Sequence, residues 1–201
     1  MAGRGRTGRD LREACVTEAL AIIAERGVEE LSLREVARRL DVSHQAPYKH
    51  FPSRDALLAE VVARAFAAFA AHLDARPHHE DPAQDLASLG HAYLEYATAH
   101  PLDYRLMFAT PLPDPAAHPA MLARSRHAFA VTREVAARLG GRDAAEVELD
   151  ALFMWSVVHG IAGVRVMSAV GTLDLGPDAL ARLEEHAARR LARAFGPGGA
   201  A

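Results

Sequence analysis

The stretch Ser32–Phe51, SLREVARRLDVSHQAPYKHF, predicts two short helices joined by a tight turn, and the rest of the chain is organised around it. Its first residues form a capping box, in which the Ser32 hydroxyl accepts the Glu35 amide and the Glu35 carboxylate returns to the Ser32 amide. A helix therefore begins at Leu33. Its predicted apolar face is Leu33, Val36, Ala37 and Leu40, and its outer face is Arg34, Arg38 and Arg39.

The turn falls at Asp41-Val42-Ser43, because aspartate tolerates the left-handed conformation that such a turn needs. Ser43 can then cap a second helix. In that helix Pro47 and Phe51 fall on an apolar side, whereas four polar residues at spacings of three and four share the opposite face. We call these four residues the polar stripe: His44, Gln45, Tyr48 and Lys49. The pattern is that of a helix-turn-helix.

The polar stripe has the chemistry of a DNA-contacting edge. Glutamine can pair with adenine through two hydrogen bonds, lysine can reach guanine or phosphate, and a tyrosine hydroxyl is a common phosphate contact. The solvated face of any surface helix shows a similar pattern, so the stretch alone leaves both interpretations open.

At this point the sequence resembles the DNA-binding signature of the TetR family of bacterial transcription regulators. The resemblance rests on Ser32–Ala37, Val42-Ser43, Tyr48–Phe51 and Ser53–Leu57, in that order and spacing. Together with the polar stripe it implies a DNA-binding set consisting of Ser32, Ser43, His44, Gln45, Tyr48, Lys49, His50, Ser53 and Arg54.

Two positions depart from the common family pattern. Asp41 stands where the family usually has glycine, which strains the turn. Pro47 stands where a branched apolar residue is usual, and as the fourth helical residue it forfeits about one helical hydrogen bond and bends the helix. The direction in which the side chains of the polar stripe point depends on that bend.

The composition limits the possible classes of protein. The chain has 201 residues, half of them hydrophobic, and a formal charge of −3 at pH 7, so overall charge does not indicate a nucleic-acid partner. Cys15 is the sole cysteine, which excludes an intrachain disulfide and a cysteine-based metal cluster. The N-terminus has no apolar run behind it, and the longest apolar window, 151–170, contains His159 and Arg165. We expect a soluble cytoplasmic protein.

The remaining sequence predicts an all-α protein. The predicted helices are a first one from Asp10 to Gly27, a long one capped by Ser53 that ends before Pro77, and further ones over 82–100, 101–108, from Asp114 or His118 to Gly140-Gly141, from Asp143 to about Val170, and after Gly176-Pro177. The predicted domains are a flexible basic arm (1–9, with Arg4, Arg6 and Arg9), a helix-turn-helix domain (10–52), a C-terminal regulatory and dimerisation domain (53–195) and a disordered tail (196–201).

The predicted helix from Asp143 to Val170 is apolar on nearly all sides and must therefore be buried on all sides. One face against the domain core and another against a second copy would bury it. Trp155–Gly160 and Pro101–Phe108 resemble the C-terminal domain of a TetR subgroup named for its Trp-His-Gly motif. That resemblance implies a homodimer joined through the last two helices, with an effector pocket in each C-terminal domain.

The resemblance thus implies a ligand-responsive repressor. A two-fold dimer selects a palindromic operator in double-stranded DNA, with half-sites about 34 Å apart or a multiple, and a small molecule would favour a state that no longer fits it. Bulky groups expected around the pocket are Tyr104, Met107, Phe108, Phe129, Phe153, Trp155 and His159. Such residues are often simply core, so this set predicts only a largely apolar ligand.

An enzyme or metal protein is the rival class. His78-His79-Glu80-Asp81 is the densest cluster of possible ligands, but it lies between two prolines in a linker that we expect to have no rigid geometry. No His-Glu-x-x-His pattern occurs, and Cys15 has no evident base partner. We therefore predict no enzyme, no cofactor and no metal. A helical adaptor for protein partners, a third class, would leave the polar stripe without purpose.

Overall fold

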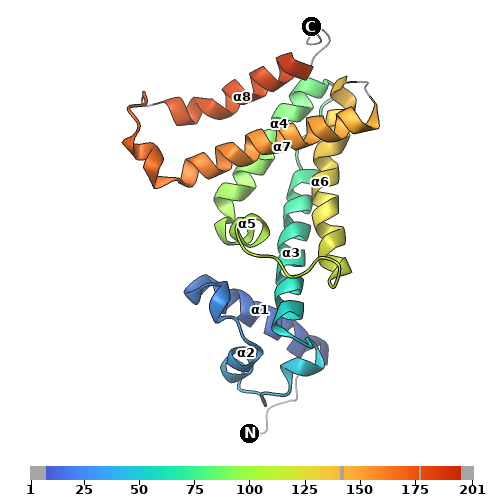
Figure 1. The fold of residues 1–201 in the computed structure, drawn as a ribbon, viewed down its shortest axis with the longest axis vertical. Coiled ribbons are helices and arrows are strands. Elements are labelled where there is room, and N and C mark those ends of the chain that lie inside the picture. The colour runs from blue at the N-terminus through green and yellow to red at the C-terminus, as the bar shows by residue number, and fades with distance from the viewer. Residues whose placement is uncertain (1–7, 141–142, 177, 196–201) are drawn as a thin grey trace. The chain divides into compact units, whose positions relative to one another are not determined.

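The computed structural model describes residues 8–140, 143–176 and 178–195, and within them the chain is helical, with no strand (Figure 1). The prediction of an all-α protein is confirmed. The α-helices are α1 (Gly8–Arg26), α2 (Leu33–Arg39), α3 (Arg54–Asp74), α4 (Pro82–Ala99), α5 (Pro101–Phe108), α6 (Pro119–Gly140), α7 (Ala144–Val166) and α8 (Ala179–Phe195). In the described part of the chain three short 3₁₀ helices join them: η1 (Val28–Glu30), η2 (Pro47–Lys49) and η3 (Ser168–Thr172).

Parts of three predictions fall outside the described residues. These parts are most of the basic arm, including Arg4 and Arg6, the disordered tail over 196–201, and the residues Gly141 and Pro177 at two predicted helix boundaries. Arg9, the last residue of the predicted arm, already belongs to α1.

The chain divides into two compact units. The N-terminal unit is Met1–Phe66 with Leu102–Ser125, and the C-terminal unit is Ala67–Pro101 with Arg126–Ala201. Helix α3 therefore supplies residues to both units. The predicted boundary between residues 52 and 53 does not coincide with this division, and it stays a prediction.

In the N-terminal unit α1 packs against η1, α2 and η2. Cys15 is fully buried in this core and behaves as a small apolar residue. Gly27 ends α1 with a φ of 91°, a conformation that favours glycine, which confirms the predicted stop. In the same unit the rings of Phe66 and Phe108 pack edge to face, with their centroids 5.9 Å apart and their planes nearly perpendicular.

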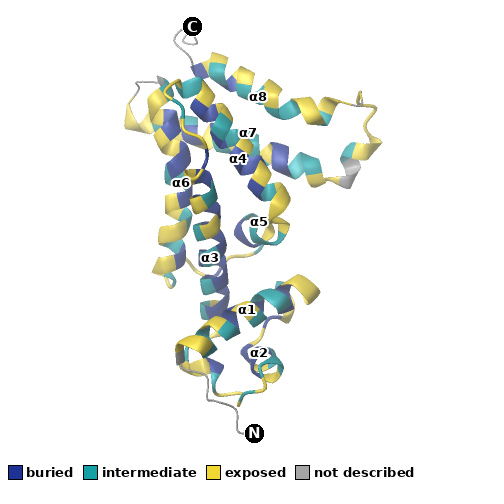
Figure 2. Ribbon diagram, turned by 180° about the vertical axis from the view of Figure 1, so that it is seen from behind, coloured by how far each residue is buried: buried dark blue, intermediate teal, exposed yellow. Residues whose placement is uncertain are grey.

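Helix α3 begins as predicted, because the Ser53 Oγ accepts the Ala56 amide at 3.0 Å. It is long and apolar enough to cross a membrane, but 61% of its most apolar stretch is buried inside the protein. Figure 2 draws many residues of α3 in the dark blue of buried residues. Burial of this kind is typical of a core helix.

In the C-terminal unit α4 packs against both α7 and α8, and these two helices pack against each other (Figure 1). The predicted cap of α7 is confirmed, since the Asp143 Oδ1 accepts the amides of Ala145 and Glu146. The helix ends at Val166, earlier than predicted, and the chain continues as η3.

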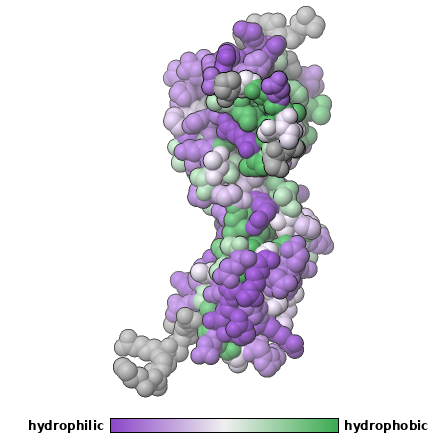
Figure 3. Space-filling model, turned by 90° about the vertical axis from the view of Figure 1, so that its left-hand side faces the viewer, coloured by the Kyte–Doolittle hydropathy of each residue, from purple (hydrophilic) through white to green (hydrophobic). Residues whose placement is uncertain are grey.

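Helix α7 is much less buried than α3, although both are apolar. Only 22% of its most apolar window is buried, although it too is long and apolar enough to cross a membrane. Leu149, Leu152 and Phe153 are 66%, 42% and 54% exposed. Apolar surface bordered by hydrophilic side chains is visible on one face of the protein (Figure 3). The side of α7 that we expected to face a partner is therefore open in the single chain.

Candidate DNA-binding surface and effector pocket

The capping box at the start of α2 is half formed. The Ser32 Oγ accepts the Glu35 amide at 3.2 Å, as predicted. The Glu35 carboxylate does not return to Ser32, because it accepts bonds from Arg38 at 2.7 Å and from Arg39 at 3.2 Å. These arginines hold the pKa of Glu35 at about 2, well below its usual value.

Asp41 takes the left-handed conformation that the sequence predicts, with a φ of 52°. The Asp41 amide donates to the Arg38 carbonyl at 3.3 Å and the Val42 amide donates to the Ala37 carbonyl at 3.1 Å. This pair of bonds is a Schellman motif, whose left-handed position is usually glycine. The turn after α2 is therefore built as in the common pattern, but with a side chain at its strained position.

The predicted second helix is not an α-helix, and this part of the prediction is wrong. Residues 44–46 form turns, and Pro47–Lys49 form the single 3₁₀ turn η2. Since Pro47 has no N–H, the Ser43 carbonyl accepts the Ala46 amide at 2.9 Å instead. The residue at the N-cap position of η2 is Ala46, and no side chain caps this turn. Ser43 therefore does not act as the cap that the sequence predicts. Proline does more here than bend the helix.

The two faces of this segment are nevertheless arranged as predicted. All four residues of the polar stripe are exposed, and Ser43 beside them is exposed too. Pro47 and Phe51 are buried beneath them, and the Arg12 guanidinium lies 5.2 Å from the centre of the Phe51 ring. The apolar side thus anchors the segment, while the polar stripe faces outward from the N-terminal unit.

Two other predicted DNA contacts have structural tasks. Arg54 donates to the Val28 carbonyl at 2.6 Å and to the Leu31 carbonyl at 3.0 Å, so it holds η1 in place. Ser53 caps α3. His50 is half-buried at the end of η2, and Ser32 is exposed at the start of α2.

Most of the arginines in this unit are paired with acids. Arg39 pairs with Glu18, Glu25 and Glu35, and it is only 14% exposed. Glu13 and Glu60 in turn pair with Arg12 and Arg64, in a network that links α1 to α3. The predicted basic outer face of α2 is therefore largely neutralised, and the exposed cations near the polar stripe are few.

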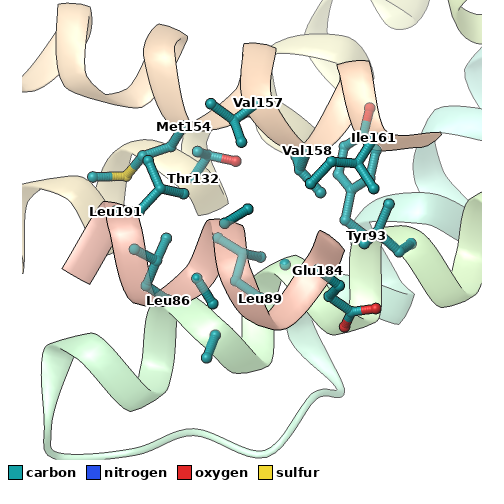
Figure 4. Close-up of a pocket in the computed structure, with 15 residues that line it drawn as sticks. Leu86, Leu89, Tyr93, Thr132, Met154, Val157, Val158, Ile161, Glu184 and Leu191 are labelled. Carbon is teal, nitrogen blue, oxygen red and sulfur yellow. The ribbon is translucent and has the colours of Figure 1, made fainter. Parts of the chain in front are cut away.

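In the C-terminal unit a narrow apolar cavity lies between α4, α6, α7 and α8 (Figure 4). It has about 40 Å³ of interior space. Its walls are formed mainly by aliphatic side chains, among them Leu86, Leu89, Thr132, Val157, Val158 and Leu191.

None of the bulky residues predicted to contact a ligand lines this cavity. Tyr104, Met107 and Phe108 belong to the N-terminal unit, whereas Phe129, Phe153, Trp155 and His159 belong to the C-terminal unit. The physical reason is that large aromatic groups fill space. The cavity forms where α4 and α8 carry small residues: Ala87, Gly90, Ala187 and Ala188. Facing small residues at helical spacing are the sequence signal that could have found it.

His159 is connected to the cavity through Tyr93. The Tyr93 hydroxyl, on the cavity wall, lies 3.0 Å from the His159 Nδ1, and the Trp155 ring packs 5.0 Å from the imidazole. Burial lowers the pKa of His159 from its usual value, so the ring is held neutral near pH 7. Sequence reasoning identified His159 and Trp155 but missed Tyr93.

A buried ion-pair cluster in the C-terminal unit was also missed. Asp85 is 1% exposed and accepts bonds from Arg138 at 2.6 Å, from Arg76 at 3.3 Å and from the His79 amide at 3.1 Å. Arg138 also donates to the carbonyls of His79 and Glu80. The linker that we expected to lack rigid geometry is therefore held firmly. Among the described residues no group of three potential ligands is placed to hold a metal ion.

Comparisons with known proteins agree with this geometry. The family model described as bacterial regulatory proteins, tetR family, matches residues 16–61. The family model described as tetracyclin repressor-like, C-terminal domain, matches residues 86–191, which is more than half of the chain. No curated protein sequence matches.

Three solved structures illustrate the likeness. The regulatory protein SCO4313 is 28% identical, with a TM-score of 0.73 over 94% of this chain and 98% of that one. A protein of unknown function from Rhodococcus sp. RHA1 is 26% identical, with a TM-score of 0.74 over 97% and 99%. A tetR family transcription regulator from Shewanella sp. PV-4 is 21% identical and shows the same fold, with a TM-score of 0.66 over 94% and 98%.

The N-terminal helix-turn-helix unit and the helical C-terminal unit correspond to the two matched family models. The chain belongs to the TetR family. It is a DNA-binding transcription regulator and not an enzyme, which confirms the predicted class.

Proposed function

We propose that the protein is a ligand-responsive repressor, which binds a palindromic operator as a homodimer in the cytoplasm and is released by a small molecule. The observation that carries this proposal is the exposed polar stripe held over the buried Pro47 and Phe51. Four side chains with hydrogen-bonding groups face solvent from a segment whose other side is fixed in a core. This arrangement suits insertion into a major groove.

In this proposal Gln45 contacts a base, and Lys49 and Tyr48 contact phosphates or bases, while Ser43, His44, His50 and Ser32 lie at the edge of the interface. Arg54 and Ser53 are bonded inside the unit, so we assign them to its scaffold. Because the neighbouring arginines are paired with acids, affinity would depend on close contact more than on general attraction to DNA.

The homodimer would form through α7 and α8. Leu149, Leu152 and Phe153 are exposed at positions that share one side of α7, and burying them against a second copy would remove apolar surface from water. A two-fold dimer would present two polar stripes to successive major grooves. The contact of Trp155 with His159 supports placement in the Trp-His-Gly subgroup as part of this proposal.

The test is binding to DNA that flanks the protein's own gene, measured over a series of salt concentrations. Lys49→Ala should weaken binding. It should also make the slope of log affinity against log salt concentration shallower by about one, which corresponds to the loss of one phosphate contact. Gln45→Ala should relax preference at one base pair, at a cost of about 1–3 kcal/mol, and leave the salt dependence unchanged. Arg133→Ala, an exposed cation on α6 in the C-terminal unit, is the control and should change neither.

Specific binding that ignores both polar-stripe substitutions would show that another surface contacts DNA. If the protein is folded by circular dichroism but forms no specific complex with this flanking DNA, the DNA does not contain its operator, and the proposal that it does would be wrong.

A further inference from the structure

Lys49 is the only lysine in the sequence, although the chain has 23 lysine and arginine residues in all. The other cations in that count are arginines. The two side chains differ chemically, because an arginine keeps its charge whereas the amine of a lysine can lose its proton and act as a nucleophile. The side chains of the protein therefore offer a single amine, and that amine belongs to the polar stripe.

The structure leaves this amine accessible. Lys49 is exposed at the end of η2, where its backbone amide donates to the Ala46 carbonyl at 3.3 Å. Pro47 in the same turn is buried, so the backbone is fixed while the Lys49 side chain faces solvent. Within the described residues no hydrogen bond or ion pair holds its ammonium group. Neither packing nor pairing would therefore keep a small reagent away from the amine.

The ion-pair network of the N-terminal unit, in contrast, takes its cations from arginine. Arg39 lies 2.6 Å from Glu25, Arg64 lies 2.6 Å from Glu13, and Arg12 lies 2.8 Å from Glu60. A reagent that acylates amines leaves these guanidinium groups as they are. Such a reagent would remove one charge from the polar stripe and none from the network, so we expect the fold to persist.

Acylation is the class of lysine modification that would change this surface most. Methylation keeps the positive charge, whereas acylation removes it. The acylated side chain has one N–H donor where the ammonium group had three, and it offers no charge to a phosphate. Arg38 and Arg39 are already paired with acids. One reaction at Lys49 would therefore remove a large share of the uncompensated positive charge beside the polar stripe.

We propose that Lys49 is an acylation site, at which acyl phosphates or acyl thioesters lower the affinity of the regulator for DNA. The Lys49 Nζ attacks the carbonyl carbon of the donor and forms a C–N bond. The C–O bond to phosphate or the C–S bond to the thiol breaks, and its electron pair stays on the leaving group. The ammonium group loses one proton to become a nucleophile and a second as the amide forms, and the leaving group and water take them up.

The effect on DNA rests on the proposed contact of Lys49 with DNA, but the reaction itself does not. The first measurement therefore concerns the reaction. The full-length protein is treated with acetyl phosphate in one arm and with acetyl-coenzyme A in the other. Trypsin cleaves after a free lysine but not after an acetylated one, so acetylation converts the peptide 40–49 into the peptide 40–54.

Mass spectrometry should find the longer peptide, carrying one acetyl group, in at least one arm, and that arm identifies the class of donor. Arg133→Lys supplies a reference amine, because residue 133 is exposed on α6 in the C-terminal unit. A Lys49 that stays unmodified in both arms, or that reacts at least about tenfold more slowly than this exposed reference amine, would overturn the site.

DNA should protect Lys49 from the reagent. Duplex DNA of mixed sequence serves at low salt, because contacts with phosphate then supply the binding and no particular operator is needed. With this DNA in excess we expect acetylation of Lys49 to slow at least about fivefold and that of the reference amine less than about twofold. Equal slowing of the two amines would show that Lys49 lies outside the DNA interface, which overturns the effect on DNA.

The acetylated protein should bind the same duplex at least about fivefold more weakly, with a salt dependence as shallow as that of Lys49→Ala. Its circular dichroism spectrum should match that of the untreated protein. Lys49→Arg has no side-chain amine, so treatment should leave this variant at whatever affinity it has before treatment. A loss of affinity in treated Lys49→Arg would place the effect at another group and overturn the assignment to Lys49.

The two measurements separate this inference from the proposed DNA contact. If Lys49 is acetylated while the affinity for DNA stays the same, the proposed contact is wrong and so is the effect of acylation on binding. If Lys49→Ala weakens DNA binding but Lys49 stays unmodified in both arms, the contact stands and the acylation site alone is overturned.

Discussion

Among the residues that the structure describes, Asp41 alone of the non-glycine residues has a positive φ. Its position in the Schellman motif requires that conformation, which costs an L-residue about 1–2 kcal/mol. Aspartate is one of the residue types that tolerate it best, because its short side chain can bond locally. The strained residue stands directly before the segment that presents the polar stripe.

We predict that Asp41→Gly raises the free energy of unfolding by about 0.5 kcal/mol, since relief of strain exceeds the added chain entropy of glycine. Asp41→Ala should lower it by about 1 kcal/mol, because alanine lacks the local polar contact. Urea unfolding measures both. If Asp41→Gly were the less stable of the two variants, the φ of this residue would not be the source of strain.

His159 makes stability depend on pH. Burial lowers its pKa in the folded protein below the ordinary value of 6.5, so the unfolded chain binds the proton more readily. The stability that neutral His159 contributes is therefore complete above about pH 6.5 and declines as the pH falls below it. Unfolding measured from pH 8 to pH 5 should show a steeper decline in the wild-type protein than in His159→Gln. Identical slopes would contradict this.

At the scale of elements, Pro47 decides the form of the segment that follows α2. The turn at Ser43–Ala46 and the single turn of η2 replace an α-helix because the one missing N–H lies where helical bonding would have to continue. The polar stripe survives, because burial of Pro47 and Phe51 fixes which side faces inward. Packing thus preserves the faces while the backbone bonding changes.

Pro47→Ala should restore a donor that can reach the Ser43 carbonyl. We predict that the backbone chemical shifts of residues 44–50 move towards α-helical values in nuclear magnetic resonance spectra. Pro52→Ala, an exposed proline just beyond the segment, should leave these shifts in place. Unchanged shifts in Pro47→Ala would mean that tertiary packing, and not the proline, imposes the 3₁₀ turn.

The Asp85 cluster fixes the linker between α3 and α4. Asp85→Ala would leave Arg76, which is 7% exposed, without its partner, so the free energy of unfolding should fall by about 3–5 kcal/mol. Glu95→Ala on the same helix removes an exposed carboxylate and should cost less than about 1 kcal/mol. Urea unfolding compares them, and similar losses would show that burial gives Asp85 no special weight.

At the scale of the whole molecule, the open apolar side of α7 predicts self-association. Leu152→Glu should convert the proposed dimer into a folded monomer, because a carboxylate cannot be buried unpaired in the interface. Leu112→Glu is a close control, since Leu112 and Leu152 are 40% and 42% exposed. Analytical ultracentrifugation gives the mass of each variant. A monomeric wild-type protein, or a dimeric Leu152→Glu, would contradict the proposed interface.

Operator affinity should fall together with dimerisation in Leu152→Glu, because a single N-terminal unit contacts only one half-site. The circular dichroism spectrum should remain that of the wild-type protein, since Leu152 is exposed in the single chain.

By itself, the sequence determined what depends on residues close together along the chain. The caps at Ser32, Ser53 and Asp143, the left-handed Asp41 and the inward side of Pro47 and Phe51 all follow from spacings of a few residues. These features are correct because the hydrogen bonds of caps and turns join near neighbours. The missing N–H of Pro47 is also a local feature, but from it the sequence predicts only a bend, whereas the structure has no second α-helix.

Only the tertiary structure decided which distant residues meet. It pairs Arg39 with Glu18, 21 positions away, and Arg138 with Asp85, 53 positions away. It forms the cavity between helices far apart in the sequence, where the small residues Ala87, Gly90, Ala187 and Ala188 meet. The physical reason is that a cavity and a compensated charge are properties of side chains packed from several elements, and no spacing along one helix specifies them.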